Sequence, residues 1–238
     1  MDSGATVLVP SVDRARGYRG LAGGRVGIHP LRAGAALPQP PGRECALVVV
    51  TGSAVRCDET LAPGDGVYLP SGGDCGLRAA SAETRILVVH GEKAGSGEVV
   101  GWKYAAARQA DGGVLAGVGG FSGMGVRWLV TSATVGSAGV VVATSVFQPG
   151  GRHEPHRHPH AAEFFLLVYG SGEHCAPRGP IRLRAGDLVF VPAGEWHGYR
   201  TDPGTVTRAI YGYLGAGSLE AAGYELDRKE AGTCARPS

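Results

Sequence analysis

The feature that most constrains this chain is a segment that occurs twice at matched spacing. Residues 61–72 read LAPGDGVYLPSG, and residues 183–194 read LRAGDLVFVPAG. Leu, Gly, Asp, Val, an aromatic residue, an aliphatic residue, Pro and Gly recur in the same order, and Gly186 follows Gly64 by 122 residues. Each copy predicts a Gly-Asp turn followed by a buried strand that ends at Pro. The repeat therefore indicates two similar β units within one chain.

A second pair of segments supports the same division. Residues 46–52 and 164–170 are both apolar runs that end in Gly, and they lie 118 residues apart. Two barrels of roughly a hundred residues each would explain both offsets. We expect an N-terminal domain over residues 1–97, a polar, glycine-containing linker over residues 98–120, and a C-terminal domain over residues 121–238.

The composition agrees with an all-β protein and excludes several classes. The 41 Gly and 15 Pro among 238 residues lie between short apolar runs, which is typical of a β-sandwich or barrel. A net charge of +2 offers no basic surface for nucleic acid, and no apolar run is long enough to span a membrane. Residues 1–10 do not resemble a secretory signal, and the five Cys show no CxxC spacing. We therefore expect a cytoplasmic protein without a disulfide framework.

The second half contains a group of residues suited to metal binding. His156 and His158 are two residues apart on an expected strand, so both side chains face the same side of the sheet. Glu163 begins the next apolar run, and His197 follows a separate strand and its turn. In a closed barrel these four side chains can converge. Three imidazoles and a carboxylate suit Fe, Mn, Zn, Ni or Co rather than Ca or Mg.

Two segments that contain these residues resemble the two signature motifs of the cupin superfamily. They are residues 150–170 and 186–197, in which Gly, His, Glu and Pro stand at the spacing of the motifs. The resemblance implies an all-β fold of two tandem cupin (jelly-roll β-barrel) domains, followed by a short helical C-terminal segment. It also implies one divalent transition metal per chain, with the ligands His156, His158, Glu163 and His197. The one departure is Thr201, where the second motif often has Asn; this position is not a ligand.

The alternative for the histidines is a surface tract over residues 153–160 that binds metal adventitiously. Glu163 and His197 at the expected distances favour the metal site. We expect His153 and His160 to lie at the rim or in solvent, and His174 to lie in a loop between the motifs.

The N-terminal half lacks the corresponding residues. Alignment of the repeats places Cys45 opposite Glu163 and Cys75 opposite His197, and no His-x-His precedes Cys45. We therefore predict a degenerate cupin barrel without a metal site.

Strand alternation suggests which residues lie around the predicted metal. Tyr169 shares the face of Glu163, and Tyr199 shares the face of His197. Arg200 and Trp128 are further candidates for substrate contact. For each of them, packing or simple exposure is the alternative, and no general base is assigned.

A second, shorter resemblance bears on function. Residues 43–52 and 66–70 are similar to the first barrel of the deoxyglucuronate isomerases of inositol catabolism, a family that also has its metal in the second barrel. We expect an enzyme whose metal acts as a Lewis acid in isomerising a small hydroxy acid, keto acid or sugar acid. The alternatives are a dioxygenase or decarboxylase that uses Fe or Mn with dioxygen, and a non-catalytic ligand-binding cupin. The expected partner is a small-molecule substrate, with neither nucleic acid nor membrane, and the expected assembly is a homodimer.

Overall fold

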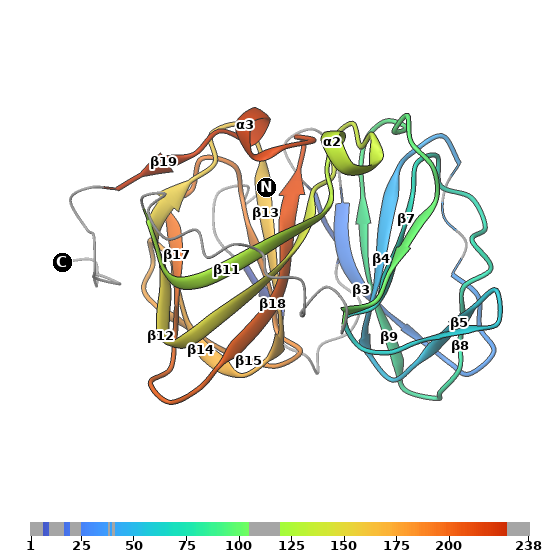
Figure 1. Ribbon diagram of the computed structural model, residues 1–238, viewed down its shortest axis with the longest axis horizontal. Coiled ribbons are helices and arrows are strands. Elements are labelled where there is room, and N and C mark those ends of the chain that lie inside the picture. Colours follow the sequence, from blue (N-terminus) through green and yellow to red (C-terminus); the bar gives the residue numbers. More distant parts are fainter. Residues whose placement is uncertain are drawn as a thin grey trace.

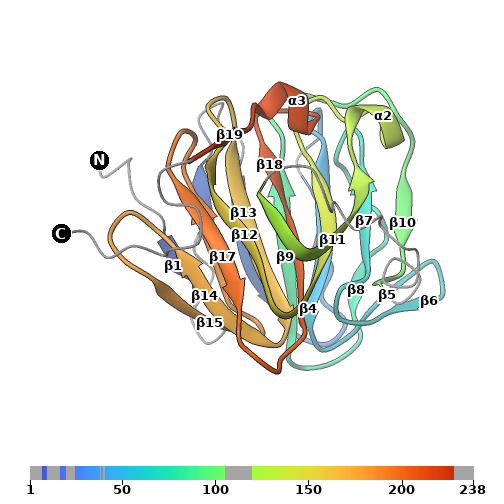
Figure 2. The same cartoon turned by 60° about the vertical axis from the view of Figure 1, so that its left-hand side comes forward.

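The computed structural model describes residues 7–9, 17–19, 25–37, 39, 41–104 and 120–227. In this part of the chain, antiparallel strands form two curled β units that lie side by side (Figures 1 and 2). The predicted all-β, double-barrel cupin fold is confirmed. None of the described helices is long and apolar enough to cross a membrane. The sequence also predicts a C-terminal tail after Asp227, and this tail lies outside the described residues.

The C-terminal barrel is built from a ten-stranded sheet. Eight strands follow the order β1-β16-β13-β18-β12-β17-β14-β15, and both β11 and β19 pair with β12. The strands are β1 (Val7–Val9), β11 (Phe121–Val130), β12 (Val142–Arg157), β13 (Ala162–Tyr169), β14 (Ser171–Cys175), β15 (Ile181–Arg184), β16 (Leu188–Val191), β17 (His197–Thr201), β18 (Thr207–Leu214) and β19 (Glu225–Leu226).

The N-terminal barrel is built from a six-stranded and a three-stranded sheet, in the orders β10-β7-β4-β9-β3-β2 and β6-β5-β8. The strands are β2 (Gly17–Arg19), β3 (Arg25–Leu31), β4 (Cys45–Thr51), β5 (Ala54–Arg56), β6 (Glu59–Leu61), β7 (Gly66–Leu69), β8 (Arg78–Ala79), β9 (Thr84–His90) and β10 (Val100–Trp102).

Two strands depart from the predicted domain boundaries. β1 lies within the predicted N-terminal domain but pairs with β16 of the C-terminal barrel. β10 lies within the predicted linker but pairs with β7 of the N-terminal barrel. Strand pairing joins residues far apart in the chain, which a division by sequence position does not detect. The rest of the linker, residues 105–119, lies outside the described residues, and the exact boundaries stay a prediction.

The repeated Gly-Asp segment forms the same turn in both barrels. Gly64 and Gly186 adopt φ angles of 92° and 93°, in the left-handed region that glycine tolerates. The carboxylates of Asp65 and Asp187 each accept a hydrogen bond from the backbone N–H three residues earlier, at 2.8 Å in both copies. The local interactions therefore repeat along with the sequence.

Strand alternation produces three apolar cores. In β4, Leu47 faces the interior of the N-terminal barrel, whereas Val48 faces the other barrel. In β13, Phe165 faces the interior of the C-terminal barrel, whereas Phe164 joins Val48 in the shared core between the barrels. The backs of the two barrels therefore form one continuous apolar interface.

A buried carboxylate also joins the barrels. Glu44, just before β4, is fully buried, and its oxygens accept hydrogen bonds from the Tyr68 hydroxyl at 2.7 Å and the Ser137 hydroxyl at 2.7 Å. Backbone N–H groups of Ala138 and Gly139 donate to it at 3.0 and 2.6 Å. Four donors from both halves of the chain compensate the burial of this charge.

Two short helices lie at the barrel ends. Thr131 caps α2 (Ser132–Val135), and Ser218 caps α3 (Leu219–Ala222). The second confirms the short helical stretch predicted after Ser218.

Candidate metal centre

The predicted histidine pair lies at the end of the longest strand. His156 belongs to β12 and His158 follows its last residue, and both side chains are 1% exposed. β12 pairs with β17 in a register that puts His156 opposite His197. The third histidine therefore reaches the pair through strand pairing rather than through proximity in sequence.

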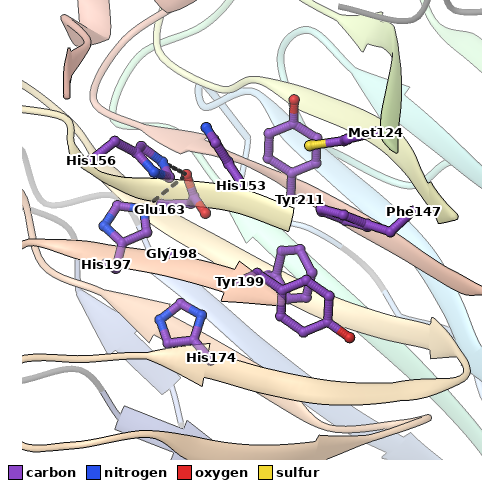
Figure 3. Close-up of a pocket in the computed structure, with 11 residues that line it drawn as sticks. Met124, Phe147, His153, His156, Glu163, His174, His197, Gly198, Tyr199 and Tyr211 are labelled. Carbon is purple, nitrogen blue, oxygen red and sulfur yellow. Dashed lines mark ion pairs between the residues drawn. The ribbon is translucent and has the colours of Figure 1, made fainter. Parts of the chain in front are cut away.

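Glu163 completes the group. It is the second residue of β13, and its Oε2 lies 3.2 Å from His158 Nε2, 3.4 Å from His197 Nε2 and 4.0 Å from His156 Nε2. The four candidate ligand atoms all lie within 4.8 Å of one another. Metal–ligand bonds of about 2.0–2.2 Å would place neighbouring ligand atoms about 3–3.5 Å apart. The structure thus brings together all four side chains that the sequence predicted as ligands (Figure 3 shows three of them).

The hydrogen bonds of the three imidazoles suit a metal. Each Nδ1–H donates to a backbone carbonyl oxygen: His156 to Glu154 at 2.8 Å, His158 to Gly223 at 2.6 Å and His197 to Glu195 at 2.9 Å. Because a carbonyl oxygen only accepts, these bonds place the ring proton on Nδ1 and leave the Nε2 lone pair free. The three Nε2 atoms and Glu163 Oε2 are buried without a hydrogen-bond partner. Such a set of orphaned acceptors fits a divalent transition metal.

The charges of the cluster are coupled. Burial alone would raise the pKa of Glu163, but the electrostatic attraction of His197 holds it well below its usual value. Burial, together with the positive charge of His197, lowers the pKa of His156 to about 3. The pKa of His197 is raised, because the attraction of Glu163 outweighs the burial that would lower it. The carboxylate is thus ionised beside imidazoles, the state in which a metal is bound.

The cluster faces a small pocket inside the C-terminal barrel (Figure 3). The pocket has about 270 Å³ of empty space, a volume that includes solvent at its open side. Its wall is aromatic and apolar away from the cluster. The lining residues are Met124, Phe147, His153, His156, Glu163, Phe165, His174, His197, Gly198, Tyr199 and Tyr211.

Two histidines of the pocket were misplaced by the sequence analysis. His153 was expected at the rim or in solvent, but it is only 9% exposed and its ring stacks on His156 at 3.6 Å. His174 was expected in a loop, but it lies in β14, is 1% exposed and stacks on His197 at 5.8 Å. His160 is exposed, as predicted. A strand assignment for residues 171–175 would have placed His174 on the same face as Gly172, toward the barrel interior.

The C-terminal segment also contributes to the centre in a way that its sequence did not indicate. The Gly223 carbonyl orients His158, and the Tyr224 hydroxyl lies 3.1 Å from His153 Nε2. β19 then pairs with β12 in a register that places Leu226 opposite His156. This segment therefore lies beside the cluster and holds one of its imidazoles in place.

Of the side chains predicted to lie around the metal, some line the pocket and others do not. Tyr199 lines the pocket. Trp128 does not line it but packs behind it against Tyr211 at 6.0 Å. Arg200 is exposed and pairs with Glu173 at 3.0 Å, so it points away from the cluster.

Tyr169 is not at the centre. Its side chain is 55% exposed, with the Arg208 guanidinium 5.3 Å from its ring. Six residues of strand separate it from Glu163, or about 20 Å at the usual rise. A register shift between Leu167 and Tyr169 also interrupts the pairing of β13 with β18.

The equivalent position in the N-terminal barrel has different chemistry. Cys45 pairs with Leu69 just as Glu163 pairs with Val191, which matches the alignment of the repeats. Burial and the nearby Cys75 and Glu44 raise the pKa of the Cys45 thiol to about 12, so it stays protonated. Among the described residues, the cluster in the C-terminal barrel is the one group suited to hold a metal.

The cysteines differ in state. Cys45, Cys57 and Cys75 are free thiols, whereas Cys175 is disulfide-bonded. Among the described residues Cys175 alone is bridged, which does not amount to the disulfide framework that the sequence argues against.

Comparison with known proteins identifies a domain of known family. Residues 143–210, which include all four residues of the cluster, match the model of the cupin domain. Over these residues, the chain has the sequence of a cupin domain. It is 34% identical over 103 residues to dimethylsulfoniopropionate lyase DddW of Ruegeria pomeroyi, an alignment that covers 42% of this chain and 66%, just under two thirds, of the lyase.

Solved structures of similar fold extend over both barrels. A salicylate 1,2-dioxygenase from Pseudaminobacter salicylatoxidans superimposes with a TM-score of 0.66 at 13% identity, covering 89% of this cupin and 80% of the dioxygenase. An IolB-like protein from Salmonella typhimurium superimposes with a TM-score of 0.64 at 16% identity, covering 94% and 97% of the two chains. At these identities, the similarity shows a shared two-barrel fold.

Proposed function

We propose that this cupin is a metal-dependent enzyme that activates a small carboxylate-bearing substrate for isomerisation or elimination. The observation that carries the proposal is the buried convergence of three Nε2 atoms and Glu163 Oε2 at the wall of a pocket. A metal held by these four groups would keep coordination positions that face the pocket, because no further protein ligand among the described residues occupies that side. Such open positions could bind a substrate.

The chain's own residues would hold the metal and shape the space beside it. His156, His158, Glu163 and His197 would be the ligands, and a bound metal would supply a Lewis acid for a carboxylate or carbonyl oxygen. The backbone carbonyls that accept from each Nδ1–H keep the imidazoles oriented. Aromatic rings, including those of Phe147 and Phe165, give the pocket an apolar wall beside the cluster.

Tyr211 would supply a polar contact to the substrate. It lines the pocket, and burial, together with the charge of Glu163, raises the pKa of its phenol well above the ordinary value. A phenol that remains protonated can donate a hydrogen bond to a substrate oxygen.

Elimination and isomerisation begin with the same step, the removal of a proton from a carbon next to an activated carbonyl or carboxylate. The lyase relative, at 34% identity, supports this class. The salicylate dioxygenase favours a second candidate, dioxygen-dependent cleavage, but at 13% identity its support extends to the fold alone. Proton abstraction therefore ranks first.

The test uses metal-loaded protein under nitrogen in deuterated water, with a panel of small carboxylates that includes dimethylsulfoniopropionate and hydroxy acids. We expect deuterium incorporation or product formation, detected by NMR, for at least one member of the panel. Glu163→Gln should abolish it, whereas His160→Ala, at an exposed histidine of the same tract, should retain it. Turnover only with consumption of dioxygen would support the second candidate, and binding without exchange or turnover would support a non-catalytic cupin.

A further inference from the structure

His174 is a buried imidazole of the pocket that stands apart from the metal cluster. It lies in β14, where it pairs with Tyr199 of β17 and Ile181 of β15, and its side chain is 1% exposed. Its ring is nearly parallel to that of His197, at an angle of 14° and a centroid distance of 5.8 Å. Figure 3 shows it below His197, on the same side of the pocket.

Neither nitrogen of His174 has a hydrogen-bond partner among the described residues, although both are buried. The three cluster imidazoles each use Nδ1 to contact a backbone carbonyl, and His153 contacts the Tyr224 hydroxyl. His174 also falls outside the group of atoms close enough to share one metal. Among the described histidines of the pocket, His174 is therefore the one that has no hydrogen-bond partner and does not belong to the metal cluster.

Besides the His197 ring, an aromatic ring and an already bonded hydroxyl lie near His174. The ring of Phe165 lies 6.4 Å away, and the Tyr199 hydroxyl is already engaged with Thr207 at 3.1 Å. A buried polar group left without a hydrogen bond is destabilising. A site that tolerates this cost beside a pocket is suited to a ligand that satisfies the group when it binds.

We propose that His174 binds a hydroxyl group of the substrate while the substrate's carboxylate lies at the metal cluster. A neutral imidazole has one donor and one acceptor nitrogen, and a hydroxyl, which both donates and accepts, can pair with whichever of the two faces the substrate. The substrate class becomes small hydroxy acids rather than simple carboxylates. This inference rests on the proposed function, because it assumes that the cluster holds a metal and a carboxylate. His174 is then a substrate-binding residue and determines specificity.

The test compares matched acids with and without a hydroxyl group on the cobalt(II)-loaded full chain. The pairs are glycolate with acetate, 3-hydroxypropionate with propionate, and 4-hydroxybutyrate with butyrate. Dissociation constants come from changes in the cobalt absorption spectrum, so the readout does not depend on turnover. In the wild type, we expect the hydroxy acid of at least one pair to bind about tenfold more tightly, the effect of one buried hydrogen bond.

Three variants test whether His174 causes the tighter binding of the hydroxy acid. His174→Phe should bind the two acids of the pair equally while it keeps its cobalt, and His174→Gln should restore part of the preference. His160→Ala should behave as the wild type. A preference that survives in His174→Phe, or loss of cobalt from that variant, overturns the inference. Equal binding of all pairs by the wild type overturns it as well and leaves the metal function standing. Failure of the wild type to bind cobalt or any acid overturns the proposed function and this inference together.

Discussion

The two barrels share a backbone design, but one has a polar cluster in its interior and the other has an apolar core. Both use the Gly-Asp turn with the same hydrogen bond, and both pair its following strand with the central strand in the same register. At the equivalent central position one barrel has Glu163, in a cluster with three histidines, and the other has Cys45, among apolar side chains. The repeated sequence therefore specifies the turn and the strand pairing. The side chains at the equivalent interior positions determine whether a barrel has a packed core or a polar site.

The difference shows which groups compensate the burial of polar side chains inside the C-terminal barrel. In the C-terminal barrel, backbone carbonyls from Glu154, Glu195 and Gly223 orient the imidazoles, and the last of these comes from the segment after α3. The N-terminal barrel instead has Cys45 at the position of Glu163, in an apolar core. A buried polar site requires such supporting hydrogen bonds, whereas an apolar core requires close packing alone.

The largest expected effect on stability concerns the carboxylate that joins the barrels. Glu44→Ala should lower the free energy of unfolding by about 3–5 kcal/mol, because it leaves several buried donors without their acceptor. Urea-induced unfolding followed by tryptophan fluorescence measures this loss. Glu92→Ala, at an exposed glutamate of the same barrel, should stay within about 0.5 kcal/mol of the wild type. Equal stability of the two variants would show that the barrels are held together by their apolar interface alone.

A matched pair of substitutions separates a packed core from a pocket wall. Leu47 and Phe165 lie at equivalent positions, but Phe165 borders the pocket, whereas Leu47 is fully buried in a core. Leu47→Ala should cost about 2–5 kcal/mol and leave metal content unchanged, whereas Phe165→Leu should cost less than about 1.5 kcal/mol. Urea unfolding and metal analysis of both variants provide the measurements. A larger loss in Phe165→Leu would mean that both interiors are packed to the same degree.

The smallest expected effect on stability concerns the ion pair between Arg182 and Asp202 of the C-terminal barrel. Asp202 accepts hydrogen bonds from Arg182 and Ser171, and these lower the pKa of its carboxyl. The equivalent turn of the N-terminal barrel has Ala80, whose N–H makes the same backbone contact. Because the folded pKa is lowered, the stabilisation is present above the unfolded value of about 3.9 and is lost as the pH falls through the folded value.

Asp202→Asn should therefore reduce stability by less than about 1 kcal/mol at pH 7, as for other surface pairs. The difference from the wild type should shrink when both are unfolded in urea below pH 4. A difference that grows in acid would contradict the assigned direction of the shift.

Much of the centre could be predicted because its determinants are local. The spacing of His156 and His158 on one strand, and the position of Glu163 at the start of the next, follow from alternation and strand length. The repeat predicted two barrels because the Gly-Asp turn depends on hydrogen bonds within a few residues.

The remaining features depend on contacts between distant segments. The pairing of β1 with β16, and the contact of Gly223 with His158, join residues that no local pattern connects. His174 was missed because its strand is short and polar, and Tyr169 was misplaced because alternation ignores distance along the strand. Local patterns therefore predicted the four side chains that cluster, whereas the pocket around them required the tertiary structure.

The most direct test of the account is the metal content of the untagged chain, measured by mass spectrometry in variants of both barrels. The wild type should hold about one transition-metal ion per chain, as expected for a single buried centre. His158→Ala and His197→Ala should lose it, and Cys45→Ala, at the position equivalent to Glu163, should keep it. Metal retained in both histidine variants, or lost with Cys45, would contradict the assignment of the centre to the C-terminal barrel.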